Sequence, residues 1–399
     1  MSEDLSGLSE APSEYSRVLG LIKSESEGPT IIVTAAIHGN EIAGIKAAER
    51  VVTRLERDRP PVRGRLLFLG GNLAALRERT RFVDLDLNRQ WTPEKVAILL
   101  DAPTDGAEAV EDTEQRDLVR VMRDEIAIAR GPIYFLDMHT SSAEGPPFLT
   151  VGDTLLNRKF AAEFPLPVIL GLEEQVDGSL LEYLNNYGIV TLGIEAGQHD
   201  SPSSIDRLEA VLWLALVAAR FVDASAVQDL QHRRRMLSQE SRDIPRVIEV
   251  RHRHAIEPTD AFRMEPGFSN FQAVRKGQIL ARDNHGLVLC PEDGLVLLPL
   301  YQGKGDDGFF VAREFRLFWL RVSAVLRRLR MGRLVKFLPG VRRHPDLDGV
   351  LIVNTRIVRL YPLDTFHLFG FRKLRREGVD LLVSRRKYDL SRPDRVRFP

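Results

Sequence analysis

The chain is poor in cysteine and in long apolar runs. Among its 399 residues, Cys290 is the single cysteine. One thiol excludes an intrachain disulfide framework, so we expect a reducing compartment, the cytoplasm. Any metal site would have to use His and carboxylate ligands. No segment approaches the roughly 20 consecutive apolar residues of a membrane-spanning helix. Residues 1–15 are polar, without a basic start or an apolar stretch, so we expect them to be disordered rather than a secretory signal.

Charge is unevenly distributed, although the formal net charge is zero. Residues 313–399 contain 22 Lys and Arg but only 8 Asp and Glu. The hydrophobic fraction of 44% and charged fraction of 28% are those of an ordinary globular protein. The asymmetry therefore indicates a distinct basic C-terminal extension with a partner surface of its own.

Apolar runs alternate with helical patterns in the first half of the chain. Short β-branched runs predict buried strands, and longer periodic segments predict helices. The predicted strands are 30–37, 65–70, 133–138 and 187–195, and the clearest helices are 41–57 and 205–222. This order predicts an α/β domain with a mostly parallel mixed sheet flanked by helices.

Short segments punctuated by Gly and Pro follow from about residue 245, and they indicate a smaller all-β domain. We therefore divide the chain into four parts. These are a disordered start (1–15), a catalytic domain (16–225), a linker with a β-rich domain (226–312) and the basic extension (313–399).

Two motifs at the ends of predicted strands carry candidate metal ligands. His38 and Glu41 lie three residues apart at a strand-to-helix turn, and His139 follows the strand 133–138. Ligands collect beyond the carboxyl ends of strands in open parallel sheets. Two His and one Glu form a common catalytic zinc set that leaves a fourth position for water. Alternatively, each His is an ordinary structural residue.

The segment 81–89, RFVDLDLNR, has two interpretations. Its alternation of polar and apolar residues is typical of an edge strand. It could also be an anion-recognition loop, because an Arg fork and an Asn amide bind carboxylates well.

Glu195 lies at the end of an apolar strand in the sequence GIEAG. A buried carboxylate is costly without a task, so Glu195 is a candidate general base; a solvated strand-end Glu is the alternative. His199, four residues later, is a candidate for the mouth of the same site.

Together, HGNE, DLDLNR, DMHT and GIEAG, in this order and spacing, resemble the succinylglutamate desuccinylase/aspartoacylase family, whose fold is that of zinc carboxypeptidases. The resemblance covers about residues 15–312 and implies one Zn²⁺ per chain. The ligands it implies are His38, Glu41 and His139.

The same resemblance implies catalytic and binding roles for five further residues. Glu195 would act as general base and then acid, and Arg81 would stabilise the oxyanion. Asn88 and Arg89 would bind a substrate carboxylate, while Asp86 would orient His38.

The chain departs from the family pattern in segment 179–194. Aspartoacylases have an arginine there that contacts the substrate carboxylate, whereas this segment has no Lys or Arg. We expect a deacylase that cleaves the amide bond of a small carboxylate-bearing substrate such as an N-acyl amino acid. A zinc carboxypeptidase acting on peptides and a non-catalytic zinc-binding protein remain alternatives. The sequence does not fix the oligomeric state.

Residues 314–333 predict an amphipathic helix with Arg side chains, including Arg327, on its flanks and back. This helix could pack on its own domain with a solvated basic face. It could also attach to an anionic membrane surface. No nucleic-acid-binding motif accompanies the basic residues, so we expect no nucleic-acid partner.

Overall fold

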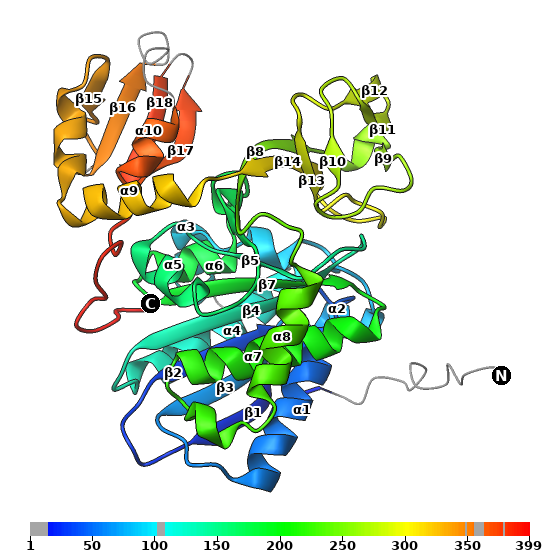
Figure 1. Cartoon of the computed structure of the whole chain (residues 1–399), viewed down its shortest axis with the longest axis vertical. Coiled ribbons are helices and arrows are strands. Elements are labelled where there is room, and N and C mark those ends of the chain that lie inside the picture. Colours follow the sequence, from blue (N-terminus) through cyan, green and yellow to red (C-terminus); the bar gives the residue numbers. More distant parts are fainter. Residues whose placement is uncertain (1–14, 102–107, 348, 355–362, 378–379) are drawn as a thin grey trace.

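The computed structural model describes residues 15–101, 108–347, 349–354, 363–377 and 380–399. The segment 1–15, predicted to be disordered, lies outside these residues except for Tyr15. Three bodies are visible in Figure 1: a large α/β part, a small β-rich part and a C-terminal module. No helix within the described ranges is long and apolar enough to cross a membrane.

A mixed eleven-stranded sheet runs through the catalytic and β-rich parts of the molecule. In spatial order its strands are β1 (Val18–Lys23), β3 (Arg65–Gly70), β2 (Thr30–Ala35), β4 (Ile133–Ser141), β7 (Val190–Gln198), β5 (Phe148–Thr150), β6 (Val168–Leu170), β8 (Val247–Ala255), β14 (Asp307–Glu314), β13 (Gly294–Leu297) and β10 (Ala273–Val274). Strands β3, β2, β4 and β7 run parallel, as predicted, whereas β1 and β5 pair antiparallel with β3 and β7.

Helices cover both faces of the catalytic part of this sheet. They are α1 (Ala43–Asp58), α2 (Leu73–Glu78), α3 (Pro93–Asp101), α4 (Val110–Ala127), α5 (Leu155–Ala161), α6 (Leu180–Asn185), α7 (Pro202–Ala218) and α8 (Leu230–Glu240). The connecting segments include the short 3-10 helices η2 (Leu87–Arg89), η3 (Leu172–Glu174), η4 (Ala224–Ala226) and η5 (Pro258–Asp260).

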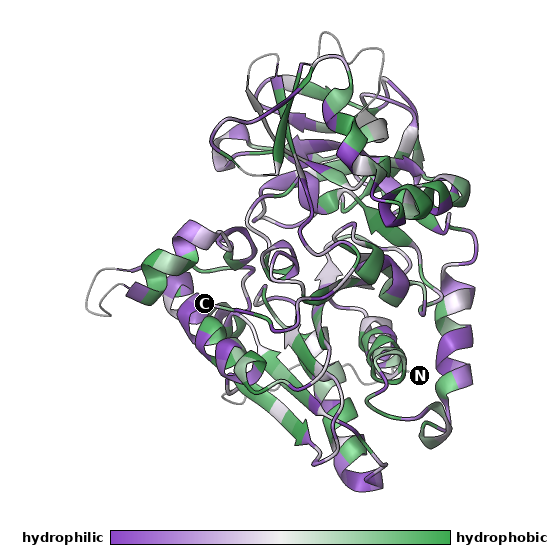
Figure 2. Ribbon diagram, turned by 90° about the vertical axis from the view of Figure 1, so that its left-hand side faces the viewer, coloured by the Kyte–Doolittle hydropathy of each residue, from purple (hydrophilic) through white to green (hydrophobic). Residues whose placement is uncertain are grey.

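Alternate side chains of β2 enter different cores, which explains why the strand reads as continuously apolar. Ile31 and Val33 pack with α1 and α7, whereas Ile32 packs with α4 and α6 on the other face. All three are at most 1% exposed, and burial of such a side chain stabilises the fold by about 1.5–3 kcal/mol. Figure 2 shows the apolar colour concentrated on the central strands and the inward faces of the helices.

The β-rich part is an outgrowth of the main sheet. Strands β8, β14, β13 and β10 continue the sheet in antiparallel order, beyond the parallel β6–β8 pair. A second sheet of β12 (Gly286–Leu289), β11 (Ile279–Asp283) and β9 (Arg263–Met264) shares a core with them. The predicted short β-strands are present, and several of them continue the catalytic sheet.

The C-terminal module has a four-stranded antiparallel sheet of its own. Its elements are α9 (Leu317–Arg328), η6 (Met331–Phe337), β15 (Val341–Arg343), β16 (Val350–Asn354), α10 (Leu363–Leu368), β17 (Phe371–Glu377) and β18 (Asp380–Arg385). The predicted helix over 314–333 is therefore shorter, and its continuation is a 3-10 helix that ends at Phe337.

Arg327 is the buried anchor of this module, contrary to its predicted place on a solvated face. The side chain is 1% exposed. Its guanidinium donates to Asp153 Oδ2 of the catalytic domain at 2.6 Å and to Asp389 Oδ1 at 3.2 Å. Burial alone would raise the pKa of Asp153, but Arg158 and Arg327 hold it well below its usual range. A buried charge requires such partners, so the basic sequence pattern here reflects docking rather than solvation.

The last residues return to the catalytic domain and add to its core. Val396 and Phe398 pack against the cluster that contains Tyr183 and Leu184 of α6. The Phe398 ring lies 5.9 Å from the Tyr183 ring and 5.3 Å from that of Tyr187. The module is therefore held to the catalytic domain both by ion pairs and by apolar burial.

His367 of α10 provides a pH-dependent part of this attachment. Its Nε2 lies 3.1 Å from Glu174 Oε2, and its Nδ1 lies 3.6 Å from Glu249 Oε1. Burial alone would lower the pKa of His367, but the two carboxylates raise it to about 10. Charged His367 therefore stabilises the fold fully below its unfolded pKa of about 6.5, and this stability is lost as pH rises toward 10.

We predict that His367→Gln lowers the free energy of unfolding by on the order of 2 kcal/mol at pH 6, because charge-assisted hydrogen bonds are lost. The difference from the parent protein should shrink steadily between pH 6.5 and 10. Urea unfolding at several pH values measures it. The same substitution at exposed His285 is the control. A deficit that stays constant across this range would contradict the assignment.

Candidate active site

The site lies at the carboxyl ends of the adjacent parallel strands β2, β4 and β7. In the register, Ala35 pairs with Met138, and His139 pairs directly with Glu195. His38 follows the end of β2 after Ala36, which adopts a left-handed φ of 55°. The strands thus carry three of the sequence-predicted residues to one edge of the sheet, as expected from their order.

Gly39 has a steric role beside His38. A Cβ at this position would lie 2.1 Å from the backbone carbon of Ala75 in α2. Only glycine allows α2 to approach the turn so closely, and this approach fixes where His38 and Glu41 leave the backbone.

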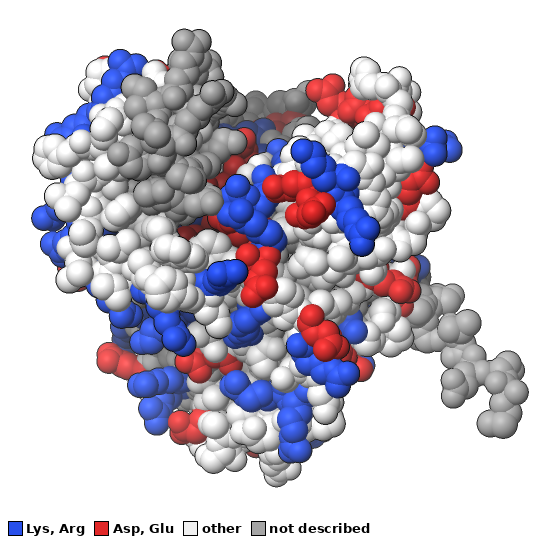
Figure 3. All heavy atoms as spheres, turned by 45° about the horizontal axis from the view of Figure 1, so that its top comes forward, with Lys and Arg blue, Asp and Glu red and all other residues white. Residues whose placement is uncertain are grey.

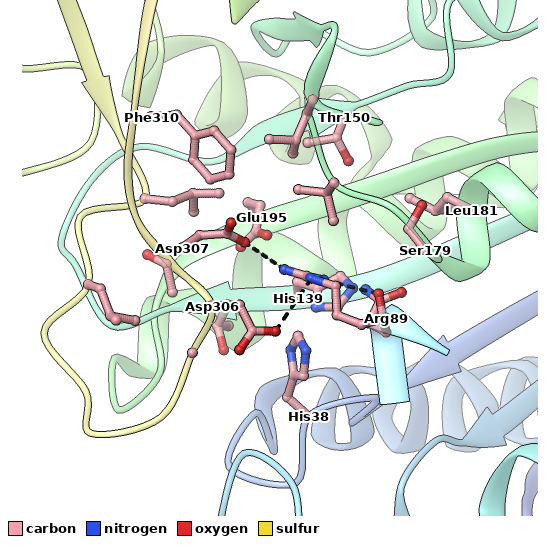
Figure 4. A pocket seen from close by; sticks show the side chains of 18 of the residues that line it. His38, Arg89, His139, Thr150, Ser179, Leu181, Glu195, Asp306, Asp307 and Phe310 are labelled. Carbon is pink, nitrogen blue, oxygen red and sulfur yellow. Dashed lines mark hydrogen bonds and ion pairs between the residues drawn. The ribbon is translucent and has the colours of Figure 1, made fainter. Parts of the chain in front are cut away.

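The carboxylate of Glu41 lies between the two imidazole rings. His38 Nδ1 is 2.7 Å from Glu41 Oε1, and His139 Nδ1 is 3.1 Å from Glu41 Oε2. Candidate ligand atoms of these three residues all lie within 4.8 Å of one another. All three side chains are buried, and Figure 4 shows His38 and His139 together at one end of the pocket.

Each imidazole has a second carboxylate behind it. His38 Nε2 is 3.2 Å from Asp86 Oδ1, the contact that the sequence led us to expect. His139 Nε2 is 2.8 Å from Asp137 Oδ2, a partner that sequence reasoning missed although Asp137 belongs to the DMHT motif. Thr34 Oγ1 donates to the other oxygen of Asp137 at 2.6 Å and fixes its orientation.

This donor set fits a divalent zinc ion. Two imidazole nitrogens and a carboxylate oxygen converge, and carboxylates hold the far nitrogen of each ring, as is typical of zinc-ligating histidines. Three protein ligands also leave room for a water or a substrate oxygen, as catalytic zinc sites require.

Glu195 lies half-buried beside this cluster, and one of its carboxylate oxygens is buried. Its Oε2 accepts no hydrogen bond from any residue that the structure describes. Burial raises the pKa of Glu195 to about 8, with His139 opposing the shift and Glu41 adding to it. A carboxyl group with this pKa can take up and release a proton near neutral pH.

The segment 81–89 is a loop that ends in η2, so the edge-strand interpretation was wrong. The carboxylate of Glu111 in α4 accepts hydrogen bonds from the backbone N–H groups of Val83, Asp84 and Leu85. These hydrogen bonds take the place of those that an edge strand would form with a neighbouring strand. The sequence analysis missed this role of Glu111, because an acidic residue in the first turn of a helix is common and does not indicate a loop contact.

Arg81 is held beside the metal cluster by this loop. It donates through Nη2 to Asp86 Oδ2 at 2.9 Å, and its Nη1 lies 3.9 Å from Glu41 Oε1. The same Asp86 carboxylate therefore orients both His38 and Arg81. The guanidinium lines the pocket, where it can face a developing negative charge.

Arg89 and Asn88 also line the pocket, but both already have partners. Arg89 Nη2 donates to Asp307 Oδ2 of β14 at 2.6 Å, whereas its buried Nε forms no hydrogen bond with a described residue and lies 4.0 Å from Asp306 Oδ2. Asn88 Oδ1 accepts from the Leu180 N–H at 3.0 Å, which leaves its NH₂ group for a ligand. In Figure 4, Asp306 and Asp307 approach Arg89 from the β-rich part.

The far wall of the pocket carries two carboxylates that the sequence did not reveal as site residues. Glu173 and Glu182 line it, and both are paired with arginines of the C-terminal module. Arg386 donates to Glu173, and Arg372 donates to Glu182. Segment 179–194 contains no arginine, and the arginines at this wall come instead from the C-terminal module.

His199 joins a polar chain around the pocket rather than the metal cluster. Its Nδ1 lies 2.7 Å from Thr140 Oγ1, and its Nε2 lies 3.3 Å from Gln302 Oε1. Asn40 donates to the same Gln302 oxygen at 2.8 Å. This chain ties the catalytic domain to the β-rich part next to the site.

Comparisons with known proteins find related sequences and folds. Residues 27–216 match the family model described as the succinylglutamate desuccinylase/aspartoacylase catalytic domain. Succinylglutamate desuccinylase of Pseudomonas putida is 42% identical over 67 residues, 17% of this chain. That of Yersinia pestis is 36% identical over 74 residues, 18% of this chain. The matched segments span only about a fifth of those relatives, 20% and 22% of their lengths.

Solved structures share the fold over a larger part of the chain. A succinylglutamate desuccinylase/aspartoacylase from Rhodobacter sphaeroides has a TM-score of 0.54 at 20% identity, covering 74% of this chain and 88% of that one. A product-bound ectoine utilization protein from Ruegeria pomeroyi has a TM-score of 0.53 at 21% identity, covering 73% and 87%. At these identities the likeness shows the fold.

We predict that the purified protein carries about one zinc per chain and that His139→Ala abolishes it, because a first ligand is removed. Asp137→Asn should keep zinc but weaken its affinity by roughly 10–100-fold, since it only orients the ligand. Elemental analysis and chelator competition measure both. His254→Ala, on β8, is the control and should retain zinc. Full occupancy in His139→Ala would sink the ligand assignment.

Proposed function

The chain belongs to the succinylglutamate desuccinylase/aspartoacylase family through residues 27–216, and we propose that it is a zinc-dependent deacylase. Its substrate would be a small carboxylate-bearing amide such as an N-acyl amino acid. Relatives that match part of this chain are named succinylglutamate desuccinylase. The observation that carries the proposal is the buried Oε2 of Glu195, which has no hydrogen-bond partner among the described residues, next to the group His38, Glu41 and His139.

His38, Glu41 and His139 would hold the zinc. When bound there, the ion would polarise the scissile carbonyl and acidify a water molecule. Asp86 and Asp137 keep the imidazoles oriented and present Nδ1 of each ring to the site.

Glu195 would move the protons of the reaction. Its Oε2 accepts the proton that the attacking water loses and then delivers it to the nitrogen of the leaving amine. Arg81, fixed by Asp86, donates to the oxygen that becomes negative in the tetrahedral intermediate. Because both groups are held before substrate binds, little reorganisation is needed.

The β-rich part limits the room above these groups. Leu298, Pro299, Leu300, Gln302 and Phe310 line the same pocket as the metal cluster. A pocket closed by a second domain suits a small substrate better than an extended peptide. The carboxypeptidase and the non-catalytic alternatives find no support in the comparisons.

Glu195→Gln provides the first test. The substitution keeps the size of the side chain but removes the proton-accepting oxygen. We expect turnover to fall on the order of a hundredfold or more, with zinc content and melting temperature retained. Steady-state hydrolysis of a panel of N-acyl amino acids measures this.

The matched control is Glu144→Gln, on an exposed loop residue, which should retain the parent rate. An unchanged rate in Glu195→Gln would mean that another group activates the water. Absence of any turnover by the zinc-loaded parent protein across the panel would refute the proposed deacylase.

Arg89→Ala tests recognition of the substrate carboxylate. The structure pairs Arg89 with Asp306 and Asp307, so a substrate carboxylate would have to share this guanidinium, and the Nε–H, which forms no hydrogen bond with a described residue, is the donor available to it. We expect KM for an acidic substrate to rise roughly 10–100-fold, because a charge-assisted hydrogen bond is lost. The corresponding primary amide should be affected far less. Exposed Arg63→Ala is the control. Equal effects on acid and amide would show that Arg89 acts only by holding Asp307.

A further inference from the structure

An apolar and basic surface on α9 and η6 is not used by the proposed chemistry. Seven large apolar side chains are exposed within 21 residues, among them Phe318 at 63%, Leu329 at 67% and Phe337 at 73%. We call this surface the α9 patch. Its apolar members are Leu317, Phe318, Trp319, Val325, Leu329, Leu334 and Phe337. Exposed Phe and Trp side chains occur nowhere else in the part of the chain that the structure describes.

The apolar side chains share a face with arginines. Phe318, Val325 and Leu329 follow one another at helical spacing along the outward side of α9, and Arg321 and Arg328 flank them. Arg330 and Arg333, between α9 and the exposed Phe337, are exposed as well. In Figure 3, the module at the upper left presents a broad uncharged surface with basic side chains along its edge.

The opposite face of α9 already packs on the protein, so the exposed α9 patch is not the face by which the helix joins its own core. Leu320 packs against the catalytic core, and Ser323 Oγ donates to Leu368 O at 2.9 Å. Buried Arg327 ties the same face to Asp153 and Asp389. Figure 1 shows α9 along the side of the module that faces the catalytic part. The inner face of α9 is therefore held in place, and its outward face is exposed to solvent.

The charge of this surface decides which partner it suits. Residues 315–345 include nine Lys and Arg and no Asp or Glu. Apart from Arg327 and Arg342, which are paired with aspartates, no basic side chain of this segment forms an ion pair within the described residues. Self-association through the patch would bring like charges together. Nucleic acid would leave the aliphatic side chains exposed to water.

We propose that the α9 patch binds the surface of a membrane that contains anionic lipids. Phe, Trp and Leu side chains would enter the boundary between headgroups and acyl chains, while Arg side chains meet lipid phosphates. Both terms are needed, because a few apolar side chains or a few charges alone bind reversibly and weakly. The site of amide hydrolysis lies in the catalytic domain, so the attachment is independent of the proposed function.

Co-flotation of the full-length protein with vesicles tests the proposal. Vesicles of phosphatidylcholine with about 30 mol% phosphatidylglycerol should bind the protein at about 0.1 M salt, and binding should weaken at about 0.5 M because salt screens exposed charges. Pure phosphatidylcholine vesicles should bind it at least tenfold less well.

Three double variants test whether the α9 patch itself, rather than any exposed apolar side chain, binds the vesicles. Phe318→Ser with Phe337→Ser should reduce binding on the order of tenfold or more, since two apolar insertions are lost. Leu287→Ser with Leu289→Ser removes two other exposed apolar side chains, 51% exposed each, from β12 and should bind like the parent. Arg321→Glu with Arg328→Glu should abolish the dependence on anionic lipid.

The proposal is overturned if the folded parent protein ignores anionic vesicles at low salt, or if both serine double variants bind alike. A dimer in sedimentation analysis that the Phe318/Phe337 variant dissolves, without vesicle binding by the parent, would instead assign the patch to a second copy of the chain. Retention on nucleic acid but not on vesicles would also overturn it.

Discussion

The carboxylate of Glu41 is the constraint on which the rest of the site depends. It contacts both imidazole rings and also accepts the Thr140 N–H at 2.9 Å, so it joins the turn after β2 to the end of β4. Burial alone would raise the pKa of Glu41, but His38 and His139 hold it well below its usual range. Such a buried charge is tolerated only where cations or a metal surround it. Gly39 allows the turn that places Glu41, and Asp86 and Asp137 orient the two imidazole rings that surround its charge.

Around this centre the chain supports each functional group from a different element. Asp86 contacts both His38 and Arg81, and Glu111 holds the loop 81–89, which carries Arg81, Asp86, Asn88 and Arg89. The β-rich part closes the pocket through Gln302 and Asp307. Because most of these supports are charged and buried, the loss of one partner leaves another uncompensated, and effects of neighbouring substitutions will not add.

The catalytic sheet could be predicted from sequence because its parallel strands are buried on both faces. Their continuous β-branched runs and the alternating helices left few alternatives, and β2, β3, β4 and α7 lie close to the predicted ranges. The cluster of His38, Glu41 and His139 could be predicted because strand order brings those ends together. Asp137 was missed because a carboxylate inside a strand has no periodic signature.

Long-range charge pairing is what the sequence could not reveal. The basic residues after 313 suggested a solvated face, yet Arg327, Arg372 and Arg386 turn inward to carboxylates of the catalytic domain. No local pattern distinguishes such an arginine from an exposed one, because its partner lies far away in the chain. The segment 81–89 misled for a similar reason: the hydrogen bonds of Glu111 replaced those of a strand neighbour.

The far wall of the pocket also has a consequence for biosynthesis. Glu173 and Glu182 are 213 and 190 residues upstream of the arginines that neutralise them. At roughly 5–20 residues per second, a ribosome needs about 10–40 s to cover that interval. During this time β7, β8 and β14 are synthesised as well, while the two acidic groups are still without their arginines. The pocket therefore receives the arginines behind this wall only after all of its lining residues, which end at Phe310, have been synthesised.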